Sequence, residues 1–383
     1  MQHIYSNSYL TIAATCSKDS TGGIFRRASP RHIAFPLTAA LNGEELLARE
    51  QLPHFDGHNT GSYPLLSRAW VLQEQIFSTR VLYFLEHEVG WECNSRRTCE
   101  CREWEPGLLG DTLTPIKTSL TSIQRSTDAD ALLDCFHAVV EQYSRRALTY
   151  PTDRLPAWAS FAKVMLQTMP GNYVAGHWDV AMPLDLLWHV APGKASVRPR
   201  EYVAPTWSWA SSTAPVIWLA LPLQSRYMTR RDWSIEPVGR VMEIKCHSVY
   251  SDPCLQVSSG HLIIDSLVVK VEYYRPDLPL SQDKYAQVPV DLRILEHPAL
   301  DSTKDFWRDY DLASGDEYHL AIGEELYFLI IAHEERRGAK GESNFSGLVL
   351  KKVPKEEAYW RIGLAQTRDD ILNYATRRTL KIV

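Results

Sequence analysis

Residues 64–84, PLLSRAWVLQEQIFSTRVLYF, constrain the fold most strongly, because helix and strand signals follow each other there without a break. Ser67 has the residue type of an N-cap, and residues 68–77 contain neither glycine nor proline. Residues 80–85 are rich in valine, tyrosine and phenylalanine, as strands are. The pattern therefore predicts a helix that passes directly into a strand, with the boundary at Ser78 and Thr79.

Gln73 is the polar residue near the centre of the apolar side of this helix. At about 100° per residue one broad arc holds the apolar side chains, and Glu74 lies at its edge. Arg68 and Gln75 are expected to point toward solvent. Because a buried amide without partners costs roughly 1–3 kcal/mol, we predict that Gln73 is buried and hydrogen-bonded to backbone. The apolar side chains of the arc are Ala69, Trp70, Leu72, Ile76 and Phe77.

The octapeptide Ser67-Arg68-Ala69-Trp70-Val71-Leu72-Gln73-Glu74 resembles the Thr-Arg-(Gly/Ala)-Trp-x-x-Gln-Glu block of fungal heterokaryon incompatibility (HET) domains. Residues 4–14, IYSNSYLTIAA, look like the segment that precedes the family's variable loop. Later stretches resemble the region that follows the domain; they are residues 141–149, 153–157, 173–178, 204–210 and 359–363. The sequence is identified as a HET domain protein, and its family-motif residues are Ser67, Arg68, Trp70, Gln73 and Glu74.

Two blocks that precede this point in the family are absent here, one of the form Ala-Leu-Ser-Tyr-x-Trp-Gly and one of the form Trp-Ile-Asp-x-x-Cys-Ile-x-Gln. We therefore expect a chain that is N-terminally truncated within the HET domain, through either a misassigned Met1 or a shortened family member. The resemblance implies a partial α/β core similar to that of Toll/interleukin-1 receptor domains.

The remaining chain divides by its local patterns, and the expected fold class is α+β. Residues 1–105 are predicted to form the C-terminal part of a HET-like domain, and residues 106–200 a helical connecting region. Residues 201–383 are predicted to form a β-rich antiparallel half. In the middle region helices are expected over 128–147, 155–167 and 182–190, and in the last region the first strand is expected over 206–210, with Trp207 and Trp209 on one face in an aromatic core.

Composition excludes several classes of function. The 41 basic and 46 acidic residues give no overall attraction to nucleic acid. The longest apolar runs, 216–223 and 326–332, are far shorter than the roughly 18 residues of a membrane span. Seven cysteines and no secretory segment predict a reduced, cytoplasmic protein.

Cys93, Cys99 and Cys101 form the one cysteine cluster, to which His87, His54 or His58 could add a fourth metal ligand. This spacing does not match the common zinc motifs, so we expect no metal and no cofactor. The sequence also lacks Gly-x-Ser-x-Gly and phosphate-loop patterns.

The resemblance implies a self/non-self recognition protein that is linked to programmed cell death. It would act as a non-catalytic signalling module with an activating protein partner, and possible homo-oligomers. The alternative is an enzyme that cleaves NAD, as some Toll-like domains do, with Glu74 as a weak candidate for the catalytic carboxylate. A third reading is an inactive decoy. We expect no NAD cleavage and at most a weak cell-death response from this chain.

Overall fold

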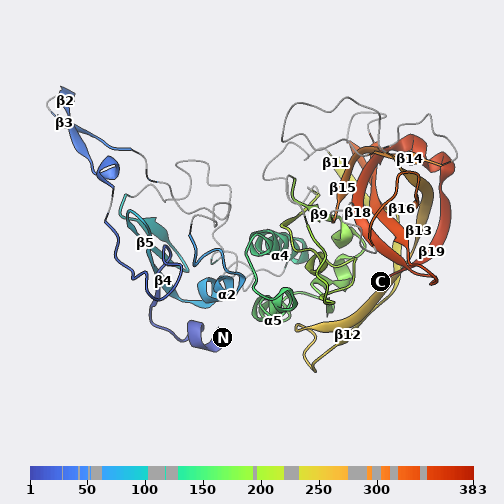
Figure 1. Ribbon diagram of the computed structural model, residues 1–383, viewed down its shortest axis with the longest axis horizontal. Coiled ribbons are helices and arrows are strands. Elements are labelled where there is room, and N and C mark those ends of the chain that lie inside the picture. Colours follow the sequence, from blue (N-terminus) through green and yellow to red (C-terminus); the bar gives the residue numbers. More distant parts are fainter. Residues whose placement is uncertain are drawn as a thin grey trace. The chain divides into compact units, whose positions relative to one another are not determined.

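The computed structural model describes residues 1–27, 29–41, 44–50, 52, 63–101, 117, 128–192, 196–219, 233–274, 291–295, 303–310, 318–336 and 343–383 (Figure 1). The chain forms two compact units. The first comprises Met1–Ser126 with Arg145–Leu148, and the second comprises Thr127–Ser144 with Thr149–Val383. The three-region division stays a prediction, and each unit is described by itself.

The first unit contains a sheet of order β1-β4-β5-β6. β1 (Thr11–Ala13) pairs in parallel with β4 (Arg80–Phe84), and the chain between them includes α2 (Ala69–Phe77), as a parallel crossover requires. The predicted helix-to-strand passage is confirmed. The predicted cap is wrong, because Arg68 is the N-cap and the Ser67 hydroxyl donates instead to the Pro64 carbonyl at 2.8 Å. The other elements are α1 (Gln2–Ser6), η1 (Pro30–His32), β2 (Phe35–Leu41), β3 (Glu44–Ala48), β5 (Val89–Cys93) and β6 (Arg97–Cys99).

In the second unit, α4 (Ala129–Ser144) confirms the helix predicted over 128–147, and α5 (Ala159–Met165) is shorter than predicted. The helix predicted over 182–190 is wrong, because η5 (Leu184–Leu186) is a single 3-10 turn and strand β9 (Trp188–Val190) follows it. β9 pairs with β10 (Val216–Trp218). The remaining short elements of this layer are η3 (Pro151–Asp153), β7 (Tyr173–Val174), β8 (His177–Trp178) and η4 (Asp179–Ala181).

The strand predicted over 206–210 is also wrong. Ser208 caps the 3-10 helix η6 (Trp209–Ser211), where its hydroxyl accepts from the Ala210 N–H at 3.0 Å. A serine that bonds to nearby backbone competes with strand pairing, which explains the turn. The expected aromatic core is present, with side chains that are fully buried: Trp158, Trp178, Trp188, Trp207 and Trp209.

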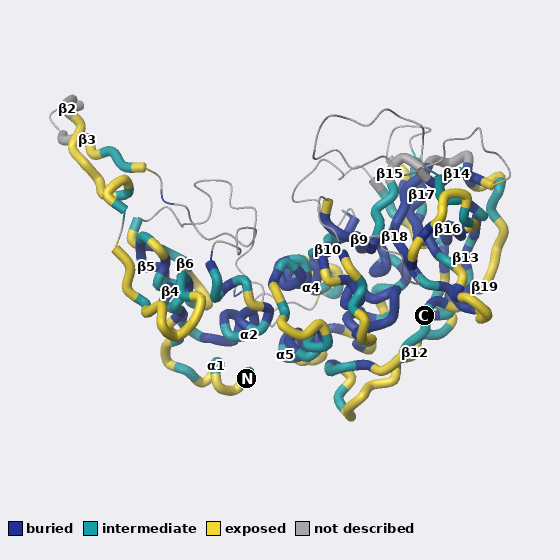
Figure 2. Tube along the Cα trace, in the orientation of Figure 1, coloured by how far each residue is buried: buried dark blue, intermediate teal, exposed yellow. Residues whose placement is uncertain are grey.

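A large sheet forms the rest of the second unit, and its ladders are antiparallel apart from one bridge between β18 and β19. The 18-residue strand β13 (Val257–Tyr274) pairs with both β16 and β19, so this sheet closes on itself. Figure 2 shows that much of β16, β17 and β18 is buried. The other strands are β11 (Trp233–Pro237), β12 (Arg240–Ser248), β14 (Asp291–Ile294), β15 (Thr303–Arg308), β16 (Glu325–Arg336), β17 (Ser343–Lys352), β18 (Tyr359–Arg368) and β19 (Thr376–Ile382), with η9 (Asp369–Tyr374) between the last two. Among the described helices, each is too short or too polar to cross a membrane.

His189 gives the second unit a pH-dependent stability. Its ring is buried in β9 and stacks on Trp307 with centroids 4.7 Å apart. Burial, reinforced by the charge of Arg361, lowers the pKa of His189 to about 4, whereas an unfolded histidine titrates near 6.5. Between these values the unfolded chain binds a proton that the folded chain does not, so the free energy of unfolding falls as the pH falls.

We expect His189 to contribute a loss of about 1.4 kcal/mol per pH unit between pH 6.5 and 4. Urea unfolding at several pH values measures this slope. His189→Phe should reduce it, whereas His247→Gln, at an exposed position of β12, should not. An unchanged slope in His189→Phe would contradict the assignment.

Candidate functional site

The family block places two polar side chains at the surface of the first unit. Arg68 is exposed, as predicted, and Glu74 is half-buried on α2. The Tyr5 phenol from α1 lies beside the Glu74 carboxylate, and burial, followed by this carboxylate, raises the pKa of Tyr5 to about 12. The block therefore presents a guanidinium and a carboxylate, and α1 adds the phenol of Tyr5 next to them.

Two amides of α2 are buried instead. The burial of Gln73, which is 3% exposed, is confirmed, and its bond to backbone stays a prediction. The expectation that Gln75 faces solvent is wrong, because Gln75 is only 6% exposed. The prediction for Gln75 failed because the Arg146 and Tyr83 side chains pack on the side of α2 that was expected to face solvent.

Gln75 is the centre of a buried polar network. Its Nε2 donates to the Tyr83 hydroxyl at 3.2 Å, and its Oε1 accepts from Arg146 Nη2 at 2.6 Å. The Tyr83 hydroxyl in turn donates to Glu92 Oε2 at 2.5 Å. Burial, and then the charge of Glu92, raise the pKa of Tyr83 well above its usual range, so the phenol stays a donor. The network joins α2, β4 and β5 to Arg146. The next residue, Ala147, accepts from the Ala69 N–H at 2.9 Å and donates to the Ser67 carbonyl at 2.6 Å.

Lys117 is a buried lysine of the first unit, and the residues next to it in the sequence lie outside the described part of the chain. Its side chain is 1% exposed, and Nζ donates to the Ser78 carbonyl at 2.5 Å. Burial lowers the pKa of Lys117, although the charge of Glu92 acts in the opposite direction and raises it. This contact fixes the boundary between α2 and β4.

Gln75→Ala is expected to destabilise the first unit by roughly 2–3 kcal/mol, because it leaves a buried guanidinium and a buried phenol each without one partner. Gln73→Ala should cost roughly 1–3 kcal/mol for the same kind of reason. Arg68→Ala, at the exposed N-cap position of the same helix, should change stability by less than about 0.5 kcal/mol. Thermal unfolding of the three variants tests the ranking, and an equal effect of Gln75→Ala and Arg68→Ala would contradict the network.

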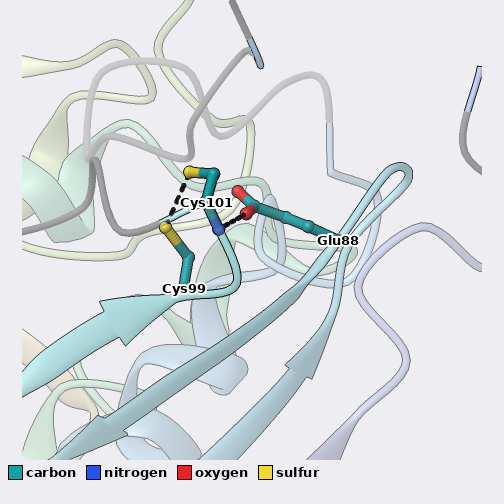
Figure 3. A group of neighbouring side chains, drawn as sticks. All are labelled: Glu88, Cys99 and Cys101. Carbon is teal, nitrogen blue, oxygen red and sulfur yellow. Dashed lines mark hydrogen bonds between the residues drawn. The ribbon is translucent and has the colours of Figure 1, made fainter. Parts of the chain in front are cut away.

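The fold collects two of the three clustered cysteines with a carboxylate. Cys99 at the end of β6 and Cys101 just after it have sulfur atoms 3.0 Å apart, and an oxygen of Glu88 lies within 4.8 Å of both (Figure 3). Cys93 is not in this group, and its sulfur contacts the Ser95 hydroxyl at 3.5 Å. The cysteine spacing did not indicate Glu88, which lies in the turn between β4 and β5 and reaches the cysteines because β5 pairs with β6.

The histidines considered with these cysteines are not in the group either. The His87 ring contacts the His32 ring in a tilted arrangement, with centroids 4.4 Å apart. His54 and His58 lie outside the described residues.

A buried carboxylate between two imidazoles lies in the second unit. Asp185 accepts from His137 Nε2 at 2.5 Å and from His177 Nδ1 at 2.6 Å, and all three side chains are buried. The Trp209 N–H donates to His177 Nε2 at 3.3 Å, which assigns the His177 proton to Nδ1. Because these groups are enclosed, they connect α4, β8 and η6 and do not form an open site.

Arg361, on β18, is a second buried charged residue of the second unit. Its Nε donates to Asp309 Oδ2 at 2.7 Å, and its Nη1 donates to the Leu186 carbonyl at 2.7 Å. Nη2 donates to the Trp188 carbonyl, and the guanidinium lies over the Trp188 ring at 3.5 Å. Arg361 therefore joins β18 to η5 and β9.

Comparison with known proteins gives one family match. The model of the heterokaryon incompatibility protein (HET) family matches residues 1–74, which end at the last residue of the block on α2. No curated protein matches the chain significantly. No solved structure matches it significantly either.

Proposed function

We propose that this chain, whose residues 1–74 belong to the heterokaryon incompatibility family, acts in fungal self/non-self recognition as a non-catalytic signalling module linked to programmed cell death. The family match is the observation that carries the heterokaryon incompatibility role. We place the protein in the cytoplasm, where a protein partner activates it, and we propose no nucleic-acid or membrane ligand. The parallel β1–β4 pair with α2 between them is compatible with a core related to Toll/interleukin-1 receptor domains.

The non-catalytic part of the proposal is supported by the surroundings of Glu74. Its carboxylate lies beside the Tyr5 phenol, where it contributes to the raised pKa of Tyr5. A general base or nucleophile needs a carboxylate that can reach substrate. The pairing with Tyr5 instead relates α1 to α2, so we assign Glu74 a positioning role.

Contact with a protein partner is supported by strand β1. In the part of the first unit that the structure describes, β1 is an edge strand, and Ile12 on it is 57% exposed. Tyr9, just before the strand, is 83% exposed. An exposed apolar edge pairs readily with an extended segment of another chain, so we propose that the partner adds a strand here.

Inducible expression in a filamentous fungus, scored as growth rate and loss of viability, tests this function. We expect slowed growth with the wild-type chain and with Glu74→Gln, and normal growth with Ile12→Lys, which blunts the edge. Leu47→Lys, at a 62% exposed apolar position of β3, is the matched control and should act like wild type. No effect of the wild-type chain would contradict the proposal, and a loss of effect in Glu74→Gln alone would favour the NAD-cleaving alternative.

A further inference from the structure

We propose, against the expectation drawn from the cysteine spacing, that Glu88, Cys99 and Cys101 bind one thiophilic divalent cation, Zn²⁺ in the first instance. The three ligand atoms come from two places in the sequence and lie within 4.8 Å of one another. Figure 3 shows the two sulfur atoms facing each other and the Glu88 carboxylate next to the Cys101 backbone. This site is independent of the family block on α2.

The sulfur–sulfur distance is informative. At 3.0 Å, Cys99 Sγ and Cys101 Sγ are well beyond the 2.05 Å of a disulfide bond, so neither sulfur is part of a disulfide. Two thiolates on a tetrahedral zinc ion, each with a bond of about 2.3 Å, lie about 3.8 Å apart. A small rotation of either side chain therefore opens the pair around a metal ion.

The carboxylate adds a third ligand to the two thiols. Glu88 is only 8% exposed, and one of its carboxylate oxygens lies within 4.8 Å of both sulfur atoms. Two thiolates and a carboxylate together are a normal set of zinc ligands. A divalent cation held by the three groups would offset their charge.

Backbone contacts hold the ligands in place before any metal binds. The Cys101 N–H donates to Glu88 Oε2 at 3.1 Å, and Cys99 is fixed opposite Gly90 in the β5–β6 ladder. A tight turn, in which the Leu85 N–H donates to the Glu88 carbonyl at 3.1 Å, fixes the carboxylate from the other side. Three protein ligands leave one tetrahedral position for water.

Cobalt is the probe, because Co²⁺ bound by thiolates absorbs visible and near-ultraviolet light and replaces Zn²⁺ in tetrahedral sites. The full chain is purified under reducing conditions, stripped with a chelator and titrated with Co²⁺. We expect one equivalent to bind, with thiolate-to-cobalt charge-transfer absorption that Zn²⁺ displaces.

Variants assign the ligands. Cys99→Ser and Cys101→Ser should each weaken binding by about 100-fold or more, and Glu88→Gln should weaken it by at least about 10-fold while it retains the charge-transfer band. Cys93→Ser, in the same hairpin, should bind like wild type. If the serine variants do not fold, protection of Cys99 and Cys101 from alkylation by Zn²⁺ in the wild-type chain gives the same information.

Three outcomes would overturn the proposal. They are no thiolate band in the wild-type chain, a full band in the Cys99→Ser, Cys101→Ser double variant, and equal alkylation of both thiols with and without Zn²⁺.

Discussion

Arg361→Ala is expected to destabilise the second unit by about 3–5 kcal/mol, the largest effect of any single substitution considered for this chain. The substitution removes a guanidinium that is 0% exposed and leaves the Asp309 carboxylate buried without it. It also removes the donors to the Leu186 and Trp188 carbonyls. Arg361→Lys should cost less than Arg361→Ala but more than 1 kcal/mol, because an ammonium cannot reproduce the fork that bonds to both oxygens of Asp309.

Arg377→Ala is the matched control for this prediction. Arg377 Nη1 also bonds to a carboxylate, Asp265 Oδ2 at 2.8 Å, but its side chain is 54% exposed. A surface pair of this kind contributes about 0–1 kcal/mol. Denaturant unfolding followed by tryptophan fluorescence measures both variants, and similar midpoints for Arg361→Ala and Arg377→Ala would show that Arg361 is not the link between β18, η5 and β9.

Asp185→Asn is expected to have the second largest effect, also about 3–5 kcal/mol. An asparagine offers one carbonyl oxygen where the carboxylate offers two, and its amide group would place a donor against the N–H of one imidazole. The Trp209 N–H holds the His177 tautomer, so this histidine cannot simply exchange its donor for an acceptor. Trp218 contacts both partners of the His137–Asp185 pair. Its ring stacks on His137 with centroids 4.2 Å apart, and its Nε1 donates to the Asp185 backbone carbonyl at 3.0 Å.

The pH dependence of Asp185 has a defined sign. Burial alone would raise the pKa of Asp185, but its interactions and hydrogen bonds with the His177 and His137 imidazoles lower it below its usual value. The stabilisation is therefore fully present above the unfolded pKa of about 3.9 and is lost as the pH falls below it. Asp185→Asn should flatten this acid limb of the stability curve, and a variant with unchanged stability at pH 7 would contradict the bonding pattern.

Local signals in the sequence were sufficient to predict helix α2 and the strand β4 that directly follows it. Residues 68–85 carry their own helix and strand preferences, and the burial of Gln73 follows from the apolar arc alone. Gln75 shows where this reasoning ends. A helical arc identifies one buried side, whereas Arg146, 71 residues away, covers a second side that only the tertiary fold reveals.

The sites made of distant residues could not be predicted for the same reason. Glu88 joins Cys99 and Cys101 only because the β5–β6 hairpin folds back on itself, and cysteine spacing says nothing about a glutamate. Arg361 and Asp309 are 52 residues apart and meet through the β15–β18 ladder. At residues 206–210 the alternation of tryptophans is typical of a strand, but the Ser208 side chain caps a 3-10 turn there instead.

The proposal that the family block signals through its surface and does not catalyse a reaction can be tested with purified protein. The purified chain is incubated with NAD, and the release of nicotinamide is measured by chromatography for wild type and for Glu74→Gln. We expect both to match the buffer control over hours. Turnover by the wild-type chain that Glu74→Gln abolishes, with its thermal stability unchanged, would contradict the claim and identify the protein as an NAD-cleaving enzyme.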